Sequence, residues 1–301
     1  MARALITGSA GFVGQHLVAH LQECGDEVIS FDQEAGHDIL DGNALHNYFR
    51  ETLPEVVYHL AGWSDVGGSW KAPVVTLRVN AEGSLNVLLA ATEVGVERLL
   101  LVSSADVYGR VTEADLPLTE NSDLHPVSPY AASKVAADFL GVQAWLGSQL
   151  PVIRARAFNH LGPGQTDRFV ASALASRIVE NERSGGSVIP VGDLSSRRDF
   201  TDVRDVVCAY RRLVEDGTPG EAYNVCSGHD MAVQELADRL LALSDTPMNF
   251  EVDPDLLRPV EVPVLRGDPS KIHAATGWKA TTPLDTTLED LLQQWRNSPW
   301  A

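Results

Sequence analysis

Short apolar runs alternate along the first half of the chain with longer amphipathic stretches. The apolar runs predict five strands, at residues 3–7, 27–31, 55–60, 98–102 and 151–156. Between them, good helix formers predict helices that include residues 15–24, 73–91 and the stretch after Ser128. Because strands and helices alternate, the pattern predicts an α/β fold, a Rossmann-type doubly wound parallel sheet with helices on both faces.

The second half predicts a smaller C-terminal substrate-binding lobe. Its expected elements are an amphipathic stretch at 168–182, a strand at 221–226 that returns to the sheet, and helices at 233–241 and 288–295. We therefore expect a Rossmann domain over residues 1–160 with returning segments at about 199–227. Residues 161–198 and 228–301 are expected to form the lobe.

Composition narrows the class of protein. The chain has 301 residues, of which 44% are hydrophobic, without an apolar run that could span a bilayer or a basic and apolar leader, which favours a soluble protein. Its 23 basic and 41 acidic residues give a net charge of −18, which disfavours nucleic acids and anionic membranes as partners. The three cysteines are far apart and form no Cys-x-x-Cys, so we expect no metal site and a reducing, cytoplasmic location.

A glycine-rich turn joins the first strand to the first helix. Gly8, Gly11 and Gly14 stand where backbone must approach a pyrophosphate, with the helix N-terminus favouring its charge. Asp32 ends the second strand, where a carboxylate accepts hydrogen bonds from the adenosine ribose and repels a 2′-phosphate. The pattern predicts a dinucleotide site that favours NAD(H), with NADP(H) as the alternative.

Tyr130 and Lys134 are four residues apart in a predicted helix, so their side chains share one face. A cation beside a phenol favours the phenolate, so Lys134 is predicted to lower the pKa of Tyr130. A lone Tyr-x-x-x-Lys is usually accidental, but here a predicted cofactor site precedes it. The pair Ser103-Ser104 follows the strand at 98–102, and a serine hydroxyl there is predicted to hydrogen-bond a substrate oxygen and to assist proton transfer.

Together these motifs resemble the extended short-chain dehydrogenases/reductases of the NAD-dependent epimerase/dehydratase family, which act on nucleotide sugars. The resemblance extends over the whole chain and includes His59-Leu60-Ala61 and the run from Ser103 to Gly109. It implies a nucleotide-sugar substrate, a homodimer, and Ser104, Tyr130 and Lys134 as catalytic residues. The cofactor contacts that it implies are Gly8, Gly11, Phe12, Val13, Gly14, Asp32, Asp38, Ile39, Leu60, Ala61, Gly62, Asn80, Tyr130 and Lys134. The implied substrate contacts are Ser104, Asp106, Tyr130, Asn159, Val191, Arg198, Arg258 and Glu261.

The segments at 156–165, 192–200 and 258–271 look most like the GDP-mannose group, which contains 4,6-dehydratases and GDP-6-deoxy-4-keto-mannose reductases. We expect residues 158–165 to form a loop, and Arg197 and Arg198 to lie in a second loop where Arg198 binds a diphosphate. The dehydratase pattern has a glutamate two positions beyond the catalytic Ser or Thr, where this chain has Asp106. The resemblance therefore favours a reductase.

Three alternatives stay open at this point. A 4-epimerase uses the same three catalytic residues in a redox-neutral cycle, and a 4,6-dehydratase is the weaker alternative within the family. A nucleotide-binding sensor on the same fold is the alternative without catalysis, because fold alone does not determine chemistry.

Overall fold

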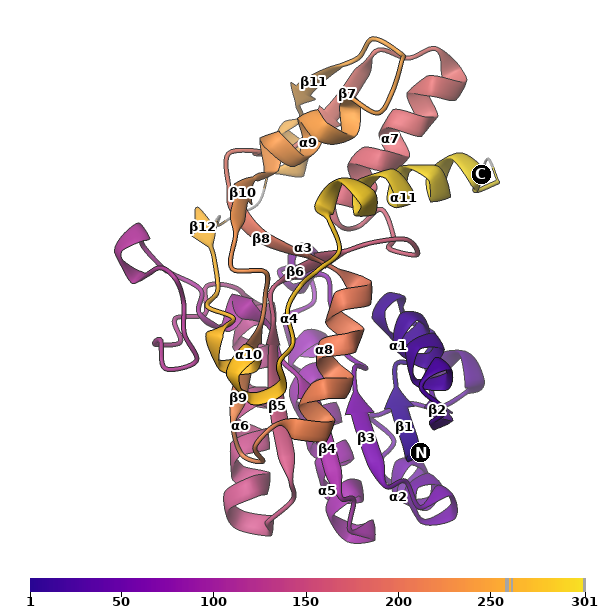
Figure 1. Cartoon of the computed structure of the whole chain (residues 1–301), viewed down its shortest axis with the longest axis vertical. Coiled ribbons are helices and arrows are strands. Elements are labelled where there is room, and N and C mark those ends of the chain that lie inside the picture. Colours follow the sequence, from indigo (N-terminus) through magenta and orange to yellow (C-terminus); the bar gives the residue numbers. More distant parts are fainter. Residues whose placement is uncertain (258–259, 261, 300–301) are drawn as a thin grey trace.

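A computed structural model describes residues 1–257, 260 and 262–299. Its largest sheet has six parallel strands in the order β2-β1-β3-β4-β5-β9 (Figure 1). These strands are β1 (Arg3–Thr7), β2 (Glu27–Phe31), β3 (Val56–His59), β4 (Arg98–Val102), β5 (Val152–Ala157) and β9 (Ala222–Val225). All six predicted strands are present, within one or two residues of the predicted boundaries.

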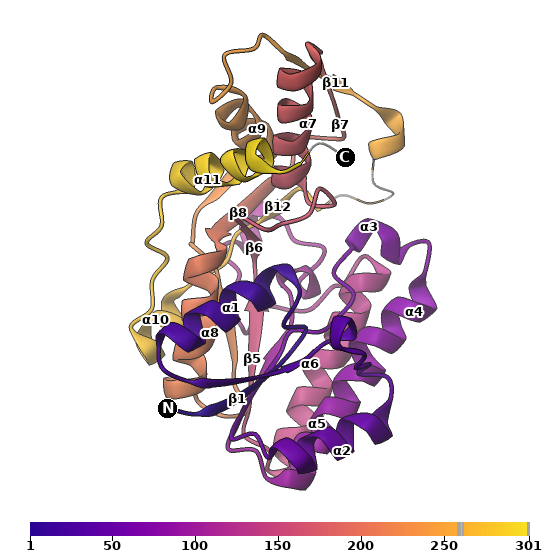
Figure 2. The ribbon, with the colours of Figure 1, turned by 90° about the vertical axis from the view of Figure 1, so that its right-hand side faces the viewer.

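Helices cover both faces of this sheet, as Figure 2 shows. One layer contains α1 (Phe12–Glu23), α8 (Val203–Asp216) and α10 (Ser270–Thr276). The other contains α2 (Gly42–Thr52), α3 (Val66–Ser69), α4 (Pro73–Leu77), α5 (Gly83–Val94) and α6 (Pro129–Ser148). The predicted doubly wound Rossmann-type sheet is confirmed.

The continuous apolar runs of the strands are explained by burial on both faces of the sheet. On β4, Leu100 packs into the core under α1 and α8, whereas Leu99 and Leu101 pack into the core under α2 and α5. Successive side chains of a strand point to opposite faces, so one leucine run serves two cores. The aligned strands also bring their carboxyl ends to one edge, where ligands bind in such sheets.

The lobe is built around β8 (Arg197–Asp202), which pairs with β6 (Asn159–Leu161), β10 (Asp230–Ala232) and β12 (Val264–Leu265). A second small sheet pairs β7 (Val188–Val191) with β11 (Asn249–Val252). Three helices, α7 (Val170–Ser184), α9 (Val233–Leu241) and α11 (Leu284–Asn297), bury a separate apolar core with these strands. The expected loops at 158–165 and around Arg197 are therefore wrong in part, because β6 and β8 pair with each other across about forty residues of sequence.

Two segments bear on the expected division of the chain. The first residues of the expected return, from Asp199 onward, lie on β8 in the lobe. Ile272 and Trp278, expected in the lobe, pack into the core beneath the six-stranded sheet. The division by residue number stays a prediction.

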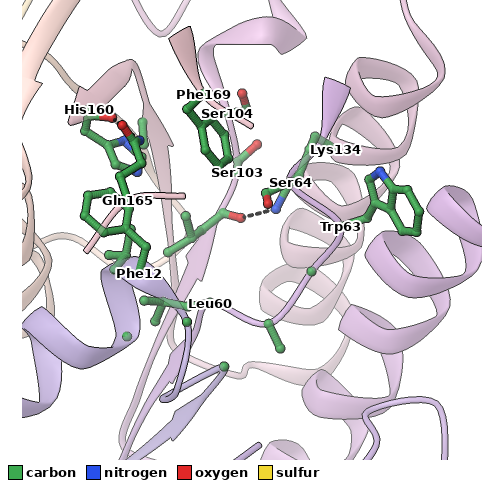
Figure 3. Close-up of a pocket in the computed structure, with 18 of the residues that line it drawn as sticks. Phe12, Leu60, Trp63, Ser64, Ser103, Ser104, Lys134, His160, Gln165 and Phe169 are labelled. Atoms are coloured by element: carbon green, nitrogen blue, oxygen red, sulfur yellow. Dashed lines mark hydrogen bonds between the residues drawn. The ribbon is translucent and has the colours of Figure 1, made fainter. Parts of the chain in front are cut away.

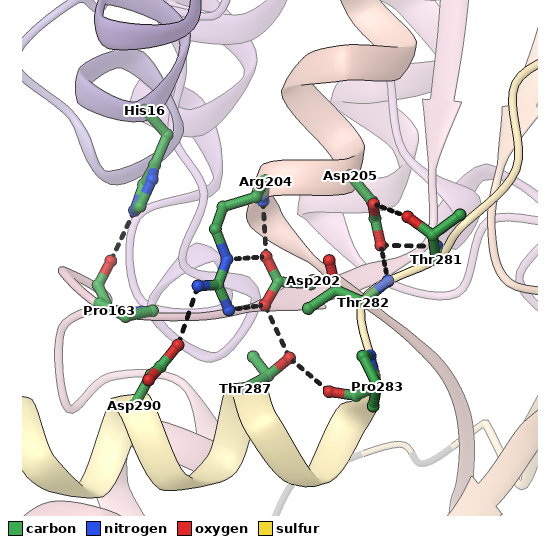
Figure 4. Close-up of polar contacts among 10 residues, drawn as sticks. All are labelled: His16, Pro163, Asp202, Arg204, Asp205, Thr281, Thr282, Pro283, Thr287 and Asp290. Carbon is green, nitrogen blue, oxygen red and sulfur yellow. Dashed lines mark hydrogen bonds and ion pairs between the residues drawn. The ribbon is translucent and has the colours of Figure 1, made fainter.

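A polar junction joins α8 of the large sheet to α11 of the lobe (Figure 4). The Asp202 carboxylate accepts hydrogen bonds from the Arg204 guanidinium at 2.9 and 2.7 Å and from the Thr287 hydroxyl at 2.6 Å. Arg204 also pairs with Asp290 of α11 at 2.8 Å. Nearby, Asp205 accepts hydrogen bonds from the backbone of residues 281 and 282. The lobe is thus attached to α8 by charge-assisted contacts.

Within the described ranges, none of the helices combines the length and the apolar character needed to cross a membrane. The same residues contain no cluster of His, Cys, Asp and Glu that could hold a metal ion. Cys24, Cys208 and Cys226 are free thiols.

Candidate active site

The glycine-rich turn folds tightly between β1 and α1. Gly8 has a positive φ of 76°, and a Cβ there would lie 2.8 Å from the backbone nitrogen of Ala61. A Cβ on Gly14 would lie 2.1 Å from the Gly8 carbonyl oxygen, so only glycine fits. Gly11 caps α1 without a side-chain hydrogen bond, which leaves the first N–H groups of the helix available to an anion.

Asp32 is fixed at the end of β2 by two backbone groups. Its Oδ2 accepts a hydrogen bond from Ala10 at 3.0 Å and its Oδ1 accepts one from Glu34 at 3.1 Å. Glu34 and Asp38 line the same part of the cavity. This acidic wall suits the hydroxyl groups of an adenosine ribose, which donate hydrogen bonds.

One cavity of about 610 Å³ runs from this wall to the start of the lobe. Its lining includes every predicted cofactor residue except Asn80, and the predicted substrate residues Ser104, Asp106, Tyr130, Asn159 and Arg198. The tight turn at Gly8 and Gly14, the open N-terminus of α1 and Asp32 fit a nicotinamide dinucleotide. The hydroxyls of Ser103 and Tyr210 also line the cavity and are buried without a hydrogen-bond partner among the described residues. They are polar groups that a bound ligand or water can satisfy.

Ser104, Tyr130 and Lys134 meet in this cavity. Helix α6 begins at Pro129, where the Ser128 hydroxyl accepts a hydrogen bond from the Ala131 backbone, and this start places Tyr130 in the first turn. Lys134, one turn later, donates from Nζ to the Val102 carbonyl at 3.0 Å (Figure 3). The Ser104 Oγ accepts a hydrogen bond from the backbone N–H of Asp106 at 3.1 Å.

The protonation of Tyr130 differs from the expectation. Burial raises the pKa of Tyr130, the Asp106 carboxylate raises it further, and the hydrogen bond with Ser104 opposes the rise. Burial lowers the pKa of Lys134 to about 8, and its ammonium is not among the groups that shift the pKa of Tyr130. The expected lowering of the Tyr130 pKa by Lys134 is therefore wrong for this structure. A phenol that stays protonated at neutral pH is suited to donate a proton.

Asn80, a predicted cofactor contact, lies behind the wall of the cavity. It sits in a π-helical turn (Arg78–Glu82) between α4 and α5 and is 1% exposed. Its Oδ1 accepts from the Trp63 backbone at 2.8 Å and its Nδ2 donates to the Ser133 hydroxyl at 2.8 Å. The structure thus places Asn80 between the loop after β3 and α6, outside the cavity lining.

On the lobe side, β8 separates the two predicted arginines. Arg198 is 8% exposed and lines the cavity, whereas Arg197 is half exposed and pairs with Asp230 at 2.5 Å. Neighbouring residues of a strand point to opposite faces, so only one guanidinium can reach the site. Val191 is buried in the lobe core and is not among the lining residues. Arg258 and Glu261 lie outside the described residues.

The sequence analysis missed several lining residues, among them Ser103, His160, Gln165, Phe169 and Tyr210. Phe12, His160 and Gln165 lie opposite Ser103, Ser104 and Lys134 in Figure 3. His160 stacks on Phe12 with ring centroids 6.2 Å apart, and burial lowers the pKa of His160. Ser103 and His160 stand beside predicted site residues, which was an available signal. No sequence signal indicated Tyr210, because it lies on a helix eighty residues beyond Tyr130.

The parallel sheet, the glycine-rich turn and the Ser-Tyr-Lys group at the strand ends together define a nicotinamide-dependent short-chain dehydrogenase/reductase of the extended type. The profile of the GDP-mannose 4,6-dehydratase family matches residues 34–291. The chain belongs to this family, and the predicted resemblance is confirmed.

Individual relatives agree with this assignment. GDP-6-deoxy-D-mannose reductase of Pseudomonas aeruginosa is 37% identical over 98% of this chain and 97% of the relative. GDP-6-deoxy-D-talose 4-dehydrogenase of Aggregatibacter actinomycetemcomitans is 29% identical over 91% of each chain.

Solved structures give the same picture. The structure of RMD from Pseudomonas aeruginosa complexed with NADPH superposes with a TM-score of 0.91 at 37% identity, covering 98% of this chain and 99% of the other. The UDP-glucose 4-epimerase of Thermus thermophilus in complex with NAD has a TM-score of 0.87 at 28% identity, covering 99% and 100%. Similar structures thus include both an NADPH and an NAD complex, and either cofactor fits the site.

Proposed function

We propose that the protein reduces the C4 ketone of a GDP-4-keto-6-deoxy-hexose to an alcohol, with NADH or NADPH as the reductant. The observation that carries this proposal is the set of groups around Tyr130. Among the described residues, four carboxylates line the cavity, and Asp106 is the one that comes from the Ser104 loop, whereas Asp32, Glu34 and Asp38 follow β2. Dehydration at C5 and C6 needs both an acid and a base beside the catalytic residues, whereas ketone reduction needs one proton donor. The similarity to GDP-6-deoxy-D-mannose reductase over nearly the whole chain supports the same activity.

The cofactor is held by groups from the large sheet. The N–H groups at the start of α1 receive the pyrophosphate, Asp32 accepts from the adenosine ribose, and Lys134 lies where it can donate to the nicotinamide ribose. When bound, the reduced nicotinamide supplies the hydride that adds to C4. The protein supplies position and the proton.

Tyr130 donates its phenolic proton to the ketone oxygen, and Ser104 donates a hydrogen bond to the same oxygen. The ketone gains a hydride and a proton and becomes the alcohol, while Tyr130 becomes a phenolate that regains a proton before the next turnover. Burial keeps Tyr130 protonated in the ground state. The Asp106 N–H occupies one acceptor site of Ser104, and the single hydroxyl proton of Ser104, which interacts with Tyr130 in this structure, turns to the ketone oxygen when the substrate binds.

The diphosphate of the nucleotide sugar is bound at the entrance to the lobe. Arg198 reaches the cavity there, and Val170 and Ala171, in the first turn of α7, line it as well. The N-cap residue Phe169 offers no side-chain hydrogen bond, so the first N–H groups of α7 are available to phosphate oxygens. A guanidinium and a helix N-terminus together compensate the local charge of a diphosphate in a chain of net charge −18.

The test is to mix the purified protein with GDP-4-keto-6-deoxy-mannose and NADH, and separately NADPH, and to follow nicotinamide absorbance and product together. Stoichiometric oxidation of the cofactor with loss of the ketone is expected. The ratio of kcat/KM for the two cofactors measures the cofactor preference. We expect this ratio to favour NADH, because Asp32 repels a 2′-phosphate. Flat absorbance with both cofactors would contradict a reductase acting on this sugar.

A 4-epimerase is the second candidate, because it needs the same three residues and no additional carboxylate. The likeness to the Thermus thermophilus UDP-glucose 4-epimerase supports it. An epimerase interconverts UDP- or GDP-hexoses at C4 without net change in nicotinamide absorbance. Incubation with each hexose and catalytic NAD, followed by sugar analysis, separates the two activities.

We also propose that the protein is a homodimer that pairs through α5 and α6. Phe139 and Leu146 on α6 and Leu89 on α5 are exposed apolar side chains on helices that pack side by side. Light scattering of the wild type should give twice the chain mass, and Phe139→Glu with Leu146→Glu should give a monomer. Val252→Glu, an equally exposed lobe position, is the matched control and should not change the mass.

The free thiols of the three cysteines support a reducing, cytoplasmic location. Fluorescent tagging and fractionation of the cells that make the protein would test this location. Finding the protein in the fraction of an oxidising compartment would contradict it.

A further inference from the structure

A buried polar cluster lies behind the catalytic residues and takes no part in the mechanism above. Its members, which we call the Arg156 cluster, come from α6, β5, β9 and the loop after Ser104. Arg156 is 5% exposed, and the other three members are completely buried. The members are Arg156, Asp138, Tyr108 and Asn224.

One arm of the cluster holds the catalytic helix. Arg156 donates from Nε and Nη2 to the two carboxylate oxygens of Asp138, at 3.1 and 3.2 Å. Asp138 lies on α6 one turn beyond Lys134 and two turns beyond Tyr130. The two-pronged contact fixes α6 both along and around its axis relative to β5.

The other arm holds the loop that carries Ser104. Arg156 donates from Nη1 to the Tyr108 hydroxyl at 3.2 Å and to the Glu120 carbonyl at 3.0 Å. The Tyr108 hydroxyl donates in turn to the Asn224 Oδ1 at 2.6 Å. Tyr108 directly follows the single helical turn Ala105–Val107 that Ser104 caps, so its anchored ring sets where that turn lies.

Arg156 is therefore the one described residue seen to contact both Asp138 of the helix that carries Tyr130 and Tyr108 of the loop that carries Ser104. We propose that Arg156 is a positioning residue that sets the separation of Ser104 and Tyr130. This inference rests on the proposed function, in which both groups act on one substrate oxygen. Lysine could keep the ion pair with Asp138 but lacks the planar fork needed to reach Tyr108 and Glu120 as well.

The separation matters because the Ser104 hydrogen bond counteracts the effect of burial on Tyr130. If the loop moves away from α6, that hydrogen bond lengthens and the pKa of Tyr130 rises further. A proton donor with a higher pKa is a weaker acid, and misplacement by about an ångström can cost on the order of a hundredfold in rate.

The experiment compares Arg156→Lys with Tyr108→Phe and with Arg154→Lys as the matched control. Arg154 also pairs with Asp138 but otherwise contacts the Gly220 carbonyl, not the Ser104 loop. We expect Arg156→Lys to lower kcat about tenfold or more at nearly constant KM. The dissociation constant for NADH should stay within about twofold of the wild-type value, because the glycine-rich turn and Asp32 lie outside the Arg156 cluster. Tyr108→Phe should give a smaller change of the same kind, and the double variant should fall short of the product of the two losses.

The outcomes are distinct. Arg154→Lys should keep the wild-type kcat and KM. An equal loss of kcat in Arg154→Lys would overturn the inference, as would an Arg156→Lys variant that weakens substrate or NADH binding as much as it lowers kcat. If Arg156→Lys does not fold, Tyr108→Phe decides, because it removes the hydrogen bonds of the Tyr108 hydroxyl with Arg156 and Asn224 and leaves the Arg156–Asp138 pair in place. Failure of the proposed function would show in the wild type, as absence of ketone reduction. In that case crystal structures of wild type and Arg156→Lys measure the distance between the Ser104 and Tyr130 hydroxyl oxygens directly, and an unchanged distance rejects the inference.

Discussion

In the domain of the six-stranded sheet, most residues that line the cavity follow directly after strands β1, β2, β3 and β4, and others, such as Tyr130 and Lys134, lie on helices. In the lobe, they come from β6, β8 and the first turn of α7, segments that meet only because β6 pairs with β8. Most lining residues of the large sheet are therefore placed by their position directly after a strand, and each strand positions its own residues. The lining residues of the lobe are placed by pairing between distant segments, so this part of the site forms only when the whole lobe is assembled.

This difference predicts that substitutions in the large sheet act on chemistry and cofactor, whereas those in the lobe act on substrate affinity and stability. The largest effect is expected for Tyr130→Phe. Loss of the proton donor should reduce kcat about a thousandfold, while the dissociation constant for NADH changes little. Stopped-flow absorbance and fluorescence titration of the cofactor measure the two quantities. A sensor without catalysis would show unchanged function in this variant, which would reject the enzyme assignment.

The next effect concerns the junction of α8 with the lobe. Asp202→Asn should lower the free energy of unfolding by about 2 kcal/mol at neutral pH, because a buried carboxylate with a charged partner is replaced. Burial tends to raise the pKa of Asp202, but the hydrogen bonds from Arg204 and Thr287 outweigh it and hold this pKa below its usual range. A lowered carboxyl pKa gives stability that is present above the unfolded pKa of about 3.9 and is lost as the pH falls through the folded value.

Denaturant melts of Asp202→Asn and wild type from neutral to acid pH check this, and the difference between them should shrink at acid pH. Asp290→Asn is the control. It removes an exposed partner of the same arginine and should cost under about 1 kcal/mol. A larger loss for Asp290→Asn than for Asp202→Asn would show that the junction depends on the surface pair.

A smaller effect is expected at the substrate entrance. Arg198→Gln should raise KM for the nucleotide sugar about thirtyfold and leave kcat within about threefold, because a charge-assisted contact with a diphosphate contributes about 2 kcal/mol. Arg197→Gln provides the matched control on the opposite face of β8 and should leave KM near the wild-type value. Equal effects of the two changes would place the diphosphate elsewhere.

The smallest effect is a pH dependence in the cofactor half. Burial lowers the pKa of Lys134 to about 8, so its ammonium is lost as the pH rises through that value. The dissociation constant for NADH should increase about tenfold between neutral pH and pH ~10, because a neutral amine is the weaker donor to the ribose. In Lys134→Met the binding should be weaker at neutral pH and flat over this range. A wild-type curve without an inflection would contradict the role of Lys134.

Much of the cofactor half could be predicted from its sequence. Its strands are apolar on both faces, and its glycine-rich turn and Asp32 lie next to the strands that position them, so local patterns carried the information. The position of Asn80 could not be predicted from local patterns. Asn80 lies behind the cavity wall because of a π-helical turn and of contacts with Trp63 and Ser133. No periodicity in the residues around Asn80 indicates that extra residue in the turn.

The sequence by itself determined the alternation of strands and helices and the family, and it predicted Ser104, Tyr130 and Lys134 as catalytic residues, because neighbouring residues on one strand end or one helical turn keep a fixed geometry. Tertiary structure alone decided that Arg198 rather than Arg197 reaches the cavity, since this depends on which face of β8 packs inward. It also decided the direction of the Tyr130 pKa, which burial and Asp106 raise and the Ser104 hydrogen bond only partly offsets. Side-chain exposure and desolvation are properties of the assembled chain, and no local pattern contains them.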